Sequence, residues 1–355
     1  KKYLQRFTLH LLLLSPLRCT ATSDTGKKNH RKLFGVYVYD DLGTGSIPDG
    51  WNNEDQRGCN PIVNATRRNQ LLDFLVDPVN AVGVVKLDCK PLAKHNDTYW
   101  PAYHQMIQTL AENDVTVHLM VSDTPSDFLP WEKSFHANVD ALSAAVPSAR
   151  IGITYDVEGE QGNSALWKNM YDVILDYDKQ TKAARPMQWA GFTFWGPFVA
   201  FQDGAPLYEK ASAIEWGTYV AGDPQDFRPS IDKLAQFVNT STNNAKVSVG
   251  LQMGYDHGLH CDQYSTCVGS MLWGKGVDRS KQKTLADWVD QVLSPELDGL
   301  GITSRLSVDA PFYLENVAGY MAFQRNLKNG RLPCTTCTSS MTKGFCAPGH
   351  YSSLG

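Results

Sequence analysis

Eight short runs of β-branched and aromatic residues recur along the chain, and helix-like segments separate most of them. This alternation is typical of parallel βα units and predicts an α/β fold, a single-domain (β/α)8 barrel of the TIM type. Two further observations agree with this class. The runs spread over about 300 residues, as in such barrels, and polar residues collect where the runs end. A doubly wound open sheet is the alternative, but no Gly-X-Gly-X-X-Gly follows the first run.

The expected elements follow the periodicity of the apolar residues. Strands are expected over residues 34–39, 82–87, 115–121, 151–157, 188–194, 214–220, 246–252 and 299–304. Helices are expected over residues 67–75, 99–112, 132–145, 165–177, 231–239, 285–293 and 314–327. The last helix is expected to end at Asn329-Gly330, a typical stop signal.

The chain divides into three parts by composition. Residues 1–21 combine a basic start, an apolar centre and a small-residue cleavage site at Cys19-Thr-Ala21, the pattern of a secretory signal peptide. Residues 22–330 form the predicted catalytic barrel. Residues 331–355 are rich in Cys, Thr, Ser and Gly without apolar periodicity, and we interpret them as a Cys-rich tail tied by disulfides or as the start of a truncated module.

Composition and charge limit the partners. The 355 residues are 42% hydrophobic and 20% charged with a formal net charge of −4, which becomes −8 once the four basic residues of the signal are removed. This charge disfavours nucleic acid as a partner, and no apolar run is long enough to span a membrane. Sequons at Asn64, Asn96 and Asn239 agree with a secreted glycoprotein. We expect a monomer without cofactor.

The cysteines fit an oxidising compartment. Of eight cysteines, Cys261 and Cys267 are close enough to close one loop, and we expect them to form a disulfide. Zinc is the competing interpretation for Cys334-X-X-Cys337 in the tail. Because the sequence contains no second such pair, disulfides are favoured and no metal site is predicted.

The strongest functional signal is the end of the fourth expected strand. In an extended segment alternate side chains share one face, so Asp156, Glu158 and Glu160 are expected to point the same way. Clustered acids repel one another and are hard to desolvate, but a neighbouring carboxylate can keep a general acid protonated near neutral pH. The sequence therefore predicts catalytic carboxylates here. A solvated acidic strand end or a cation site is the structural alternative.

Further polar and aromatic residues follow the other expected strands. Active sites of parallel barrels lie at the carboxyl ends of the strands, so these residues are candidates for substrate binding. They are Asp40, Asp88, Trp195, Tyr219, Gln252, Tyr255, Asp256 and Arg305. The aromatic members could stack on sugar rings.

Two motifs resemble the family 18 glycoside hydrolases, the chitinase-like barrels. That family carries Asp-Gly-X-Asp-X-Asp-X-Glu on its fourth strand, and Gly152-Ile153 with Asp156-X-Glu158 matches part of it. Ile151 and Thr154 replace the first two acids. Met253-Gly-Tyr-Asp-His-Gly258 is similar to the family's Met-X-Tyr-Asp segment. The resemblance implies a sugar-cleaving barrel with an acid-bearing fourth strand.

Three functions are weighed on these observations. The first is a secreted glycoside hydrolase acting on a poly- or oligosaccharide, with Glu158 as general acid and Asp156 as its partner carboxylate; Glu160 is the alternative acid. The second is a catalytically inactive, lectin-like barrel that binds carbohydrate. The third is a metal-dependent phosphodiesterase or deacetylase barrel using Asp40, Asp88 and Glu158.

Overall fold

The computed structural model describes residues 32–38, 62, 64–88, 100–157, 159–160, 162–181, 187–189, 213–217, 227–240, 246–251, 285–314, 317 and 321. All of them belong to one compact unit, Arg31–Gly355. The predicted signal segment, the Cys261–Cys267 disulfide and the Cys-rich tail lie outside the described residues.

The described strands form a closed parallel barrel in chain order, from β1 to β8. The last strand pairs with both β7 and β1, and this pairing closes the ring. The strands are β1 (Phe34–Val38), β2 (Val82–Leu87), β3 (Thr116–Asp123), β4 (Ile151–Val157), β5 (Met187–Trp189), β6 (Ala213–Gly217), β7 (Lys246–Leu251) and β8 (Phe312–Leu314). The predicted parallel α/β barrel is therefore confirmed for the described part of the chain.

The eighth strand is the exception, because it lies further along the chain than residues 299–304. Helix α12 (Ser294–Gly299) occupies the start of that range, and Gly301 has a positive φ of 73°, which an extended strand does not accommodate. A 3₁₀ turn, η6 (Thr303–Arg305), follows. The true β8 ends at Leu314, so the predicted helix cannot begin there.

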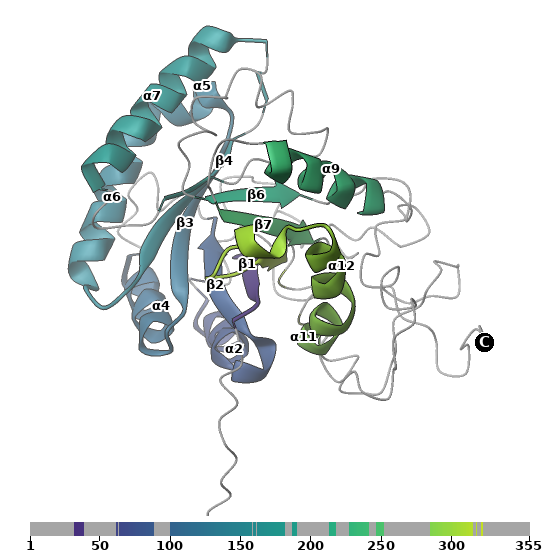
Figure 1. Cartoon of the computed structure of the whole chain (residues 1–355). Helices are drawn as coiled ribbons and strands as arrows, with labels where there is room; N and C mark the ends of the chain where they lie inside the picture. The colour runs from purple at the N-terminus through teal and green to yellow at the C-terminus, as the bar shows by residue number, and fades with distance from the viewer. Residues whose placement is uncertain are drawn as a thin grey trace, which may run out of the picture. The chain divides into compact units, whose positions relative to one another are not determined.

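The helices agree with the periodicity more closely. The longer ones are α2 (Ala65–Val76), α4 (Trp100–Glu112), α6 (Glu132–Ala145), α7 (Ser164–Thr181) and α9 (Phe227–Thr240). Shorter turns are η2 (Pro78–Asn80), α5 (Pro125–Phe128), η3 (Leu129–Trp131), α11 (Leu285–Trp288) and a π-helical turn η5 (Val289–Leu293). Figure 1 shows these helices outside the strands. The helix predicted over 285–293 is thus divided between α11 and η5.

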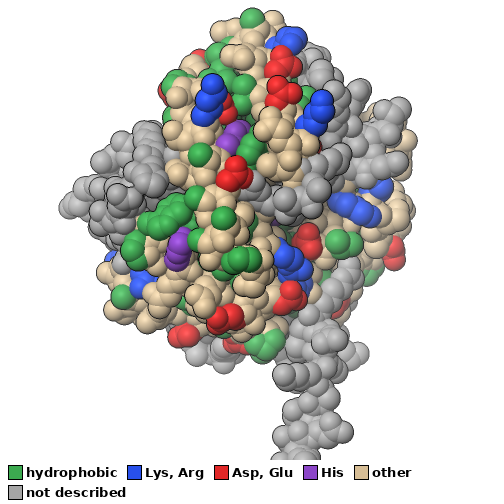
Figure 2. Space-filling model, turned by 90° about the vertical axis from the view of Figure 1, so that its left-hand side faces the viewer, with side chains coloured by type: hydrophobic (Ala, Val, Ile, Leu, Met, Phe, Trp, Pro, Cys, Tyr) green, Lys and Arg blue, Asp and Glu red, His purple; other side chains and the backbone are tan. Residues whose placement is uncertain are grey.

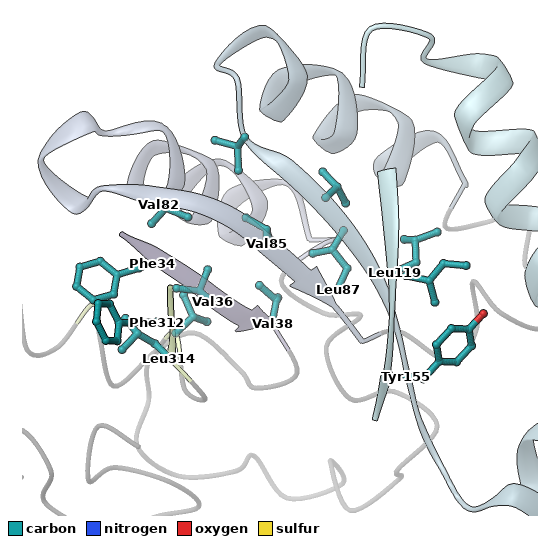
Figure 3. Packing of buried hydrophobic residues seen from close by; sticks show 14 of the residues in the cluster. Phe34, Val36, Val38, Val82, Val85, Leu87, Leu119, Tyr155, Phe312 and Leu314 are labelled. Carbon is teal, nitrogen blue, oxygen red and sulfur yellow. The ribbon is translucent and has the colours of Figure 1, made fainter. Parts of the chain in front are cut away.

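The main core lies between the strands and the helices. Side chains at alternate strand positions face outward and are buried there, as Val36 and Val38 of β1 are. At the closing seam, Phe34 pairs with Phe312 of β8, and their ring centroids lie 6.4 Å apart (Figure 3). On the face shown in Figure 2, acidic and basic side chains are interspersed with apolar ones. The apolar strand faces are therefore covered by a helix layer with a mixed outer surface.

Gly35 of β1 provides a test of the barrel interior. A Cβ atom at this position would lie 2.1 Å from Cε1 of Tyr313 on β8, so the tyrosine ring can lie against the backbone of β1 only because the side chain is absent. We expect Gly35→Ala to lower the free energy of unfolding by about 1–3 kcal/mol through overpacking, measured by urea denaturation. Gly299→Ala is the control, since nothing lies within 4 Å of its added Cβ. Equal stability of both variants would contradict this close approach.

Candidate active site at the carboxyl end of the fourth strand

The side chains of β4 alternate between the inside and the outside of the barrel as far as Asp156, as the sequence predicted. Thr154 and Asp156 are buried on the inward face, with Asp156 9% exposed. The outward residue Tyr155 belongs to the main core, and its hydroxyl lies 2.8 Å from Nε2 of His136 on α6. Because the outward face is held by packing and by this hydrogen bond, Asp156 is directed into the barrel near its carboxyl-end mouth.

The alternation ends after Val157, and this corrects the placement of Glu160. Gly159 and Glu160 both have positive φ, 82° and 52°, so the chain leaves the extended conformation. The indole Nε1 of Trp167 on α7 donates to the carbonyl oxygens of both residues, at 3.1 Å each. These contacts hold the turn from the α7 side.

Glu160 is used as a helix cap. Its side chain is exposed, and Oε2 accepts a hydrogen bond of 3.0 Å from the backbone N–H of Ser126 in the first turn of α5. A carboxylate at this position satisfies an N–H that has no partner within the helix. The expectation that Glu160 shares the face of Asp156 is therefore wrong, because the periodicity was extended beyond the strand.

Asp88 lies directly after β2, as predicted. It is 6% exposed, and its backbone N–H donates to the carbonyl oxygen of Val38 at 3.3 Å. Burial raises the pKa of Tyr103 on α4 well above its ordinary value, and the charge of Asp88 adds to the rise. The carboxylate of Asp88 thus influences the hydroxyl group of Tyr103 on α4, in the helix layer beside the mouth of the barrel.

Arg305 does not lie at the mouth, and its predicted role in substrate binding is wrong. It lies in η6, before β8, and its guanidinium group donates to the carbonyl oxygen of Val238 on α9 at 3.4 Å. The next residue, Leu306, forms a parallel bridge with Val247 near the start of β7. Arg305 therefore lies at the amino-end face of the barrel, because the strand it was assigned to was misplaced.

Most of the other predicted site residues cannot be placed. The predicted site residues outside the described part of the chain are Glu158, Asp40, Trp195, Tyr219, Gln252, Tyr255 and Asp256. Within the described part of the chain, no group of three or more His, Cys, Asp or Glu side chains is arranged to hold a metal ion. The same part contains no helix of the length and apolar character needed to cross a bilayer.

His118 of β3 is buried, and its Nδ1 lies 2.9 Å from Oγ1 of Thr154.

The structure adds a charged cluster inside the barrel that sequence reasoning missed. Lys86 of β2 forms an ion pair with Oε2 of Glu215 on β6, and both side chains are fully or almost fully buried. The hydroxyl of Tyr37 on β1 donates to Oε1 of Glu215 at 2.6 Å and accepts from Nζ of Lys86 at 3.0 Å. The ring of Tyr313 covers the ammonium group, with its centroid 3.7 Å from Nζ. We call these four residues the interior cluster.

The interior cluster lies deeper in the barrel than Asp156. Parallel barrels fill their interior with layers of side chains from alternate strands, and Lys86, Thr154, Glu215 and Tyr313 come from β2, β4, β6 and β8. Asp156 is the next inward residue of β4 toward the mouth. Burial lowers the pKa of Lys86 from its ordinary value, and the carboxylates of Glu215 and then Asp156 oppose this change.

A sequence signal for the cluster exists. Lys86 interrupts the apolar run VGVVKL, and Glu215 interrupts AIEWG. A lone charge inside a buried strand is rarely placed without a partner. Pairing the two residues, however, requires knowing that β2 and β6 face each other across the barrel.

Comparisons with known proteins identify no family. No family model matches the chain, and no curated protein matches it. Similar solved structures include the xylanase and alpha-amylase inhibitor protein XAIP-II from Scadoxus multiflorus, with 11% identity over 84% of this chain and 98% of that chain and a TM-score of 0.44. A chitinase from Bacteroides thetaiotaomicron has 11% identity over 81% of this chain and 90% of that chain, with a TM-score of 0.39.

A third similar structure is much longer. The GH138 enzyme targeting pectin rhamnogalacturonan II has 10% identity, a TM-score of 0.43 and coverage of 81% of this chain but 35% of its own. This chain thus spans about a third of that enzyme's length. TM-scores and identities this low do not identify a function, so the activity has to be argued from the residues of the site.

Proposed function

We propose that the chain is a secreted glycoside hydrolase that cleaves O-glycosidic bonds of a poly- or oligosaccharide by carboxylate catalysis at the carboxyl end of β4. One observation carries the proposal. Asp156 is a buried carboxylate directed inward at the end of β4, the region of the fold where parallel barrels place their chemistry. Burial of a carboxylate is unfavourable unless it is paired, so a position without a function would rarely carry one.

The proposed reaction needs two carboxyl groups. Glu158, two residues after Asp156, donates a proton to the leaving oxygen. Asp156 stays ionised and either holds the group that attacks the anomeric carbon or stabilises the positive charge that develops on the sugar ring.

The proposal is tested by hydrolysis of a panel of β-linked N-acetylhexosamine and hexose oligosaccharides. We expect the wild type to release shorter sugars and Asp156→Asn to lose about 10²-fold or more in kcat, because a neutral amide cannot supply the negative charge. Asp73→Asn is the matched control, since it makes the same chemical change on the exposed face of α2. It should retain full activity.

Two outcomes would contradict the proposal. If the wild type binds oligosaccharides in calorimetry but cleaves none, the lectin-like barrel is correct. If neither cleavage nor binding is observed, carbohydrate is not the substrate class, and the phosphodiesterase or deacetylase alternative is tested by adding divalent ions to the same assay with phosphodiester and N-acetyl substrates.

A further inference from the structure

We infer that His136 is a positioning residue for the proposed site: it links Glu132 of α6 to the hydroxyl group of Tyr155 and so fixes the end of β4 next to Asp156. The catalytic meaning of this inference rests on the proposed function. The chain of hydrogen bonds itself joins the helix layer to the strand and can be measured without a substrate.

Both ring nitrogens of His136 have a buried partner. Nδ1 lies 3.1 Å from Oε2 of Glu132, one turn earlier on α6, and Nε2 lies 2.8 Å from the hydroxyl oxygen of Tyr155 on β4. All three side chains are buried. An ionised carboxylate can only accept, so Glu132 places the hydrogen of the neutral ring on Nδ1, and Nε2 then accepts from the Tyr155 hydroxyl. The result is one directed chain of hydrogen bonds from α6 to β4.

Aromatic side chains fix the plane of the His136 ring. The ring of Tyr177 on α7 stacks on it, with centroids 3.7 Å apart and an interplanar angle of 5°. The ring centroids of Phe128 and Phe135 lie 6.3 Å and 5.7 Å from that of the imidazole. Within this plane a half-turn of the ring would put carbon atoms at both hydrogen-bond positions. Packing and hydrogen bonding together therefore hold the imidazole in one orientation.

The chain of hydrogen bonds ends beside the proposed carboxyl groups. Tyr155 directly precedes Asp156, and consecutive strand residues point to opposite faces, so a rotation of the strand at Tyr155 also turns Asp156. The indole of Trp167 holds the turn that follows the strand through two backbone carbonyl oxygens. His136 and Trp167 thus fix the chain before and after residues 156–158, the segment that carries both carboxyl groups of the proposed reaction.

A purely structural role, in which the hydrogen bonds only fasten α6 to the barrel, is the competing explanation. It predicts that loss of the Tyr155 hydroxyl lowers stability but leaves Asp156 and the turnover of the folded protein unchanged. The positioning role predicts motion at Asp156 and a loss in kcat at unchanged KM, because misplaced groups weaken transition-state stabilisation more than substrate binding.

The first test follows the backbone amides of Asp156 and Val157 by NMR relaxation dispersion, which detects motion on the microsecond-to-millisecond timescale. Tyr155→Phe keeps the ring in the core and removes only the hydroxyl group. We expect exchange broadening at these two amides in the variant and not in the wild type. Tyr177→Phe is the matched control, because it removes a hydroxyl whose acceptor, Asp140, lies 2.9 Å away on α6 rather than on β4. Broadening in neither variant, or equally in both, would overturn the inference.

A second measurement observes the ring of His136 itself. The ¹⁵N signals of its two ring nitrogens identify the tautomer, with His136→Gln used for assignment. In the wild type at neutral pH we expect the hydrogen on Nδ1. Glu132→Gln can accept or donate at Nδ1 and should allow both tautomers, whereas Asp140→Asn removes another carboxylate of α6 and should leave the tautomer unchanged. A wild-type ring with its hydrogen on Nε2 would overturn the directed chain of hydrogen bonds.

The kinetic readout separates this inference from the proposed function. If the wild type cleaves oligosaccharides, Tyr155→Phe should lower kcat about tenfold at unchanged KM, and Tyr177→Phe should stay fully active. An unchanged kcat in Tyr155→Phe would overturn the positioning role. If the wild type cleaves nothing while the amides of β4 still broaden, the glycosidase proposal fails and the control of His136 over the end of β4 stands.

Discussion

Replacing Glu158 with Gln should reduce glycoside cleavage by about 10² to 10⁴-fold while leaving sugar binding and folding nearly intact. Gln keeps the volume and hydrogen-bonding shape of Glu but cannot give a proton to the leaving oxygen. The effect should appear in kcat rather than in KM, because the proton is transferred only as the bond breaks. Initial rates on the oligosaccharide panel measure kcat and KM. Calorimetry on the same preparation measures sugar binding.

Glu160→Gln is the matched control for this prediction. It makes the same substitution two residues further on, where the carboxylate accepts from the backbone of Ser126. Gln retains an acceptor oxygen, so turnover should be unchanged and the loss of stability should stay within about 1 kcal/mol. Full activity of the Glu158 variant, together with an inactive Glu160 variant, would show that Glu160 is the general acid. That result would contradict the assignment of Glu160 as a helix cap.

Replacing Lys86 alone with Met should destabilise the protein strongly, by about 3–5 kcal/mol in the free energy of unfolding. The variant leaves the charge of Glu215 buried without its ammonium partner. Adding Glu215→Gln should restore most of the loss, because the uncompensated charge is then removed. Equilibrium unfolding in urea measures the single and double variants, and the cycle yields the coupling free energy.

The double-mutant cycle has a clear contrary outcome. If the double variant is as unstable as Lys86→Met, the loss comes from packing around the lysine stem rather than from the charge of Glu215. In that case the interior cluster is stabilised by the packing of its side chains, and the hydrogen-bond geometry around Nζ is a consequence of that packing.

Local patterns predicted the elements well where they were long. Strands such as residues 151–157 and helices such as residues 132–145 have periodicities that only one regular structure satisfies. The strand Phe312–Leu314 has three residues, too few to show a period, so the sequence alone pointed to a different segment. Its pairing with β1 is decided by closure of the ring, which acts over the whole chain.

The site was predictable only in part, for the same reason. The inward direction of Asp156 follows from two-residue alternation on one strand. The same prediction for Glu160 is wrong because Gly159, with its positive φ, ends that alternation. Lys86 and Glu215 are 129 residues apart in sequence. Their meeting depends on strand order and register, which no short window of sequence contains.

The short closing strand has a consequence for biosynthesis. Seven of the eight strands leave the ribosome before Phe312–Leu314 does, so the nascent chain passes through a stage in which the edges of β1 and β7 lack their final partner. Tyr313, which covers the ammonium group of Lys86, arrives with that last strand. Water therefore has access to the buried charges until β8 docks, and their desolvation coincides with the docking of three residues.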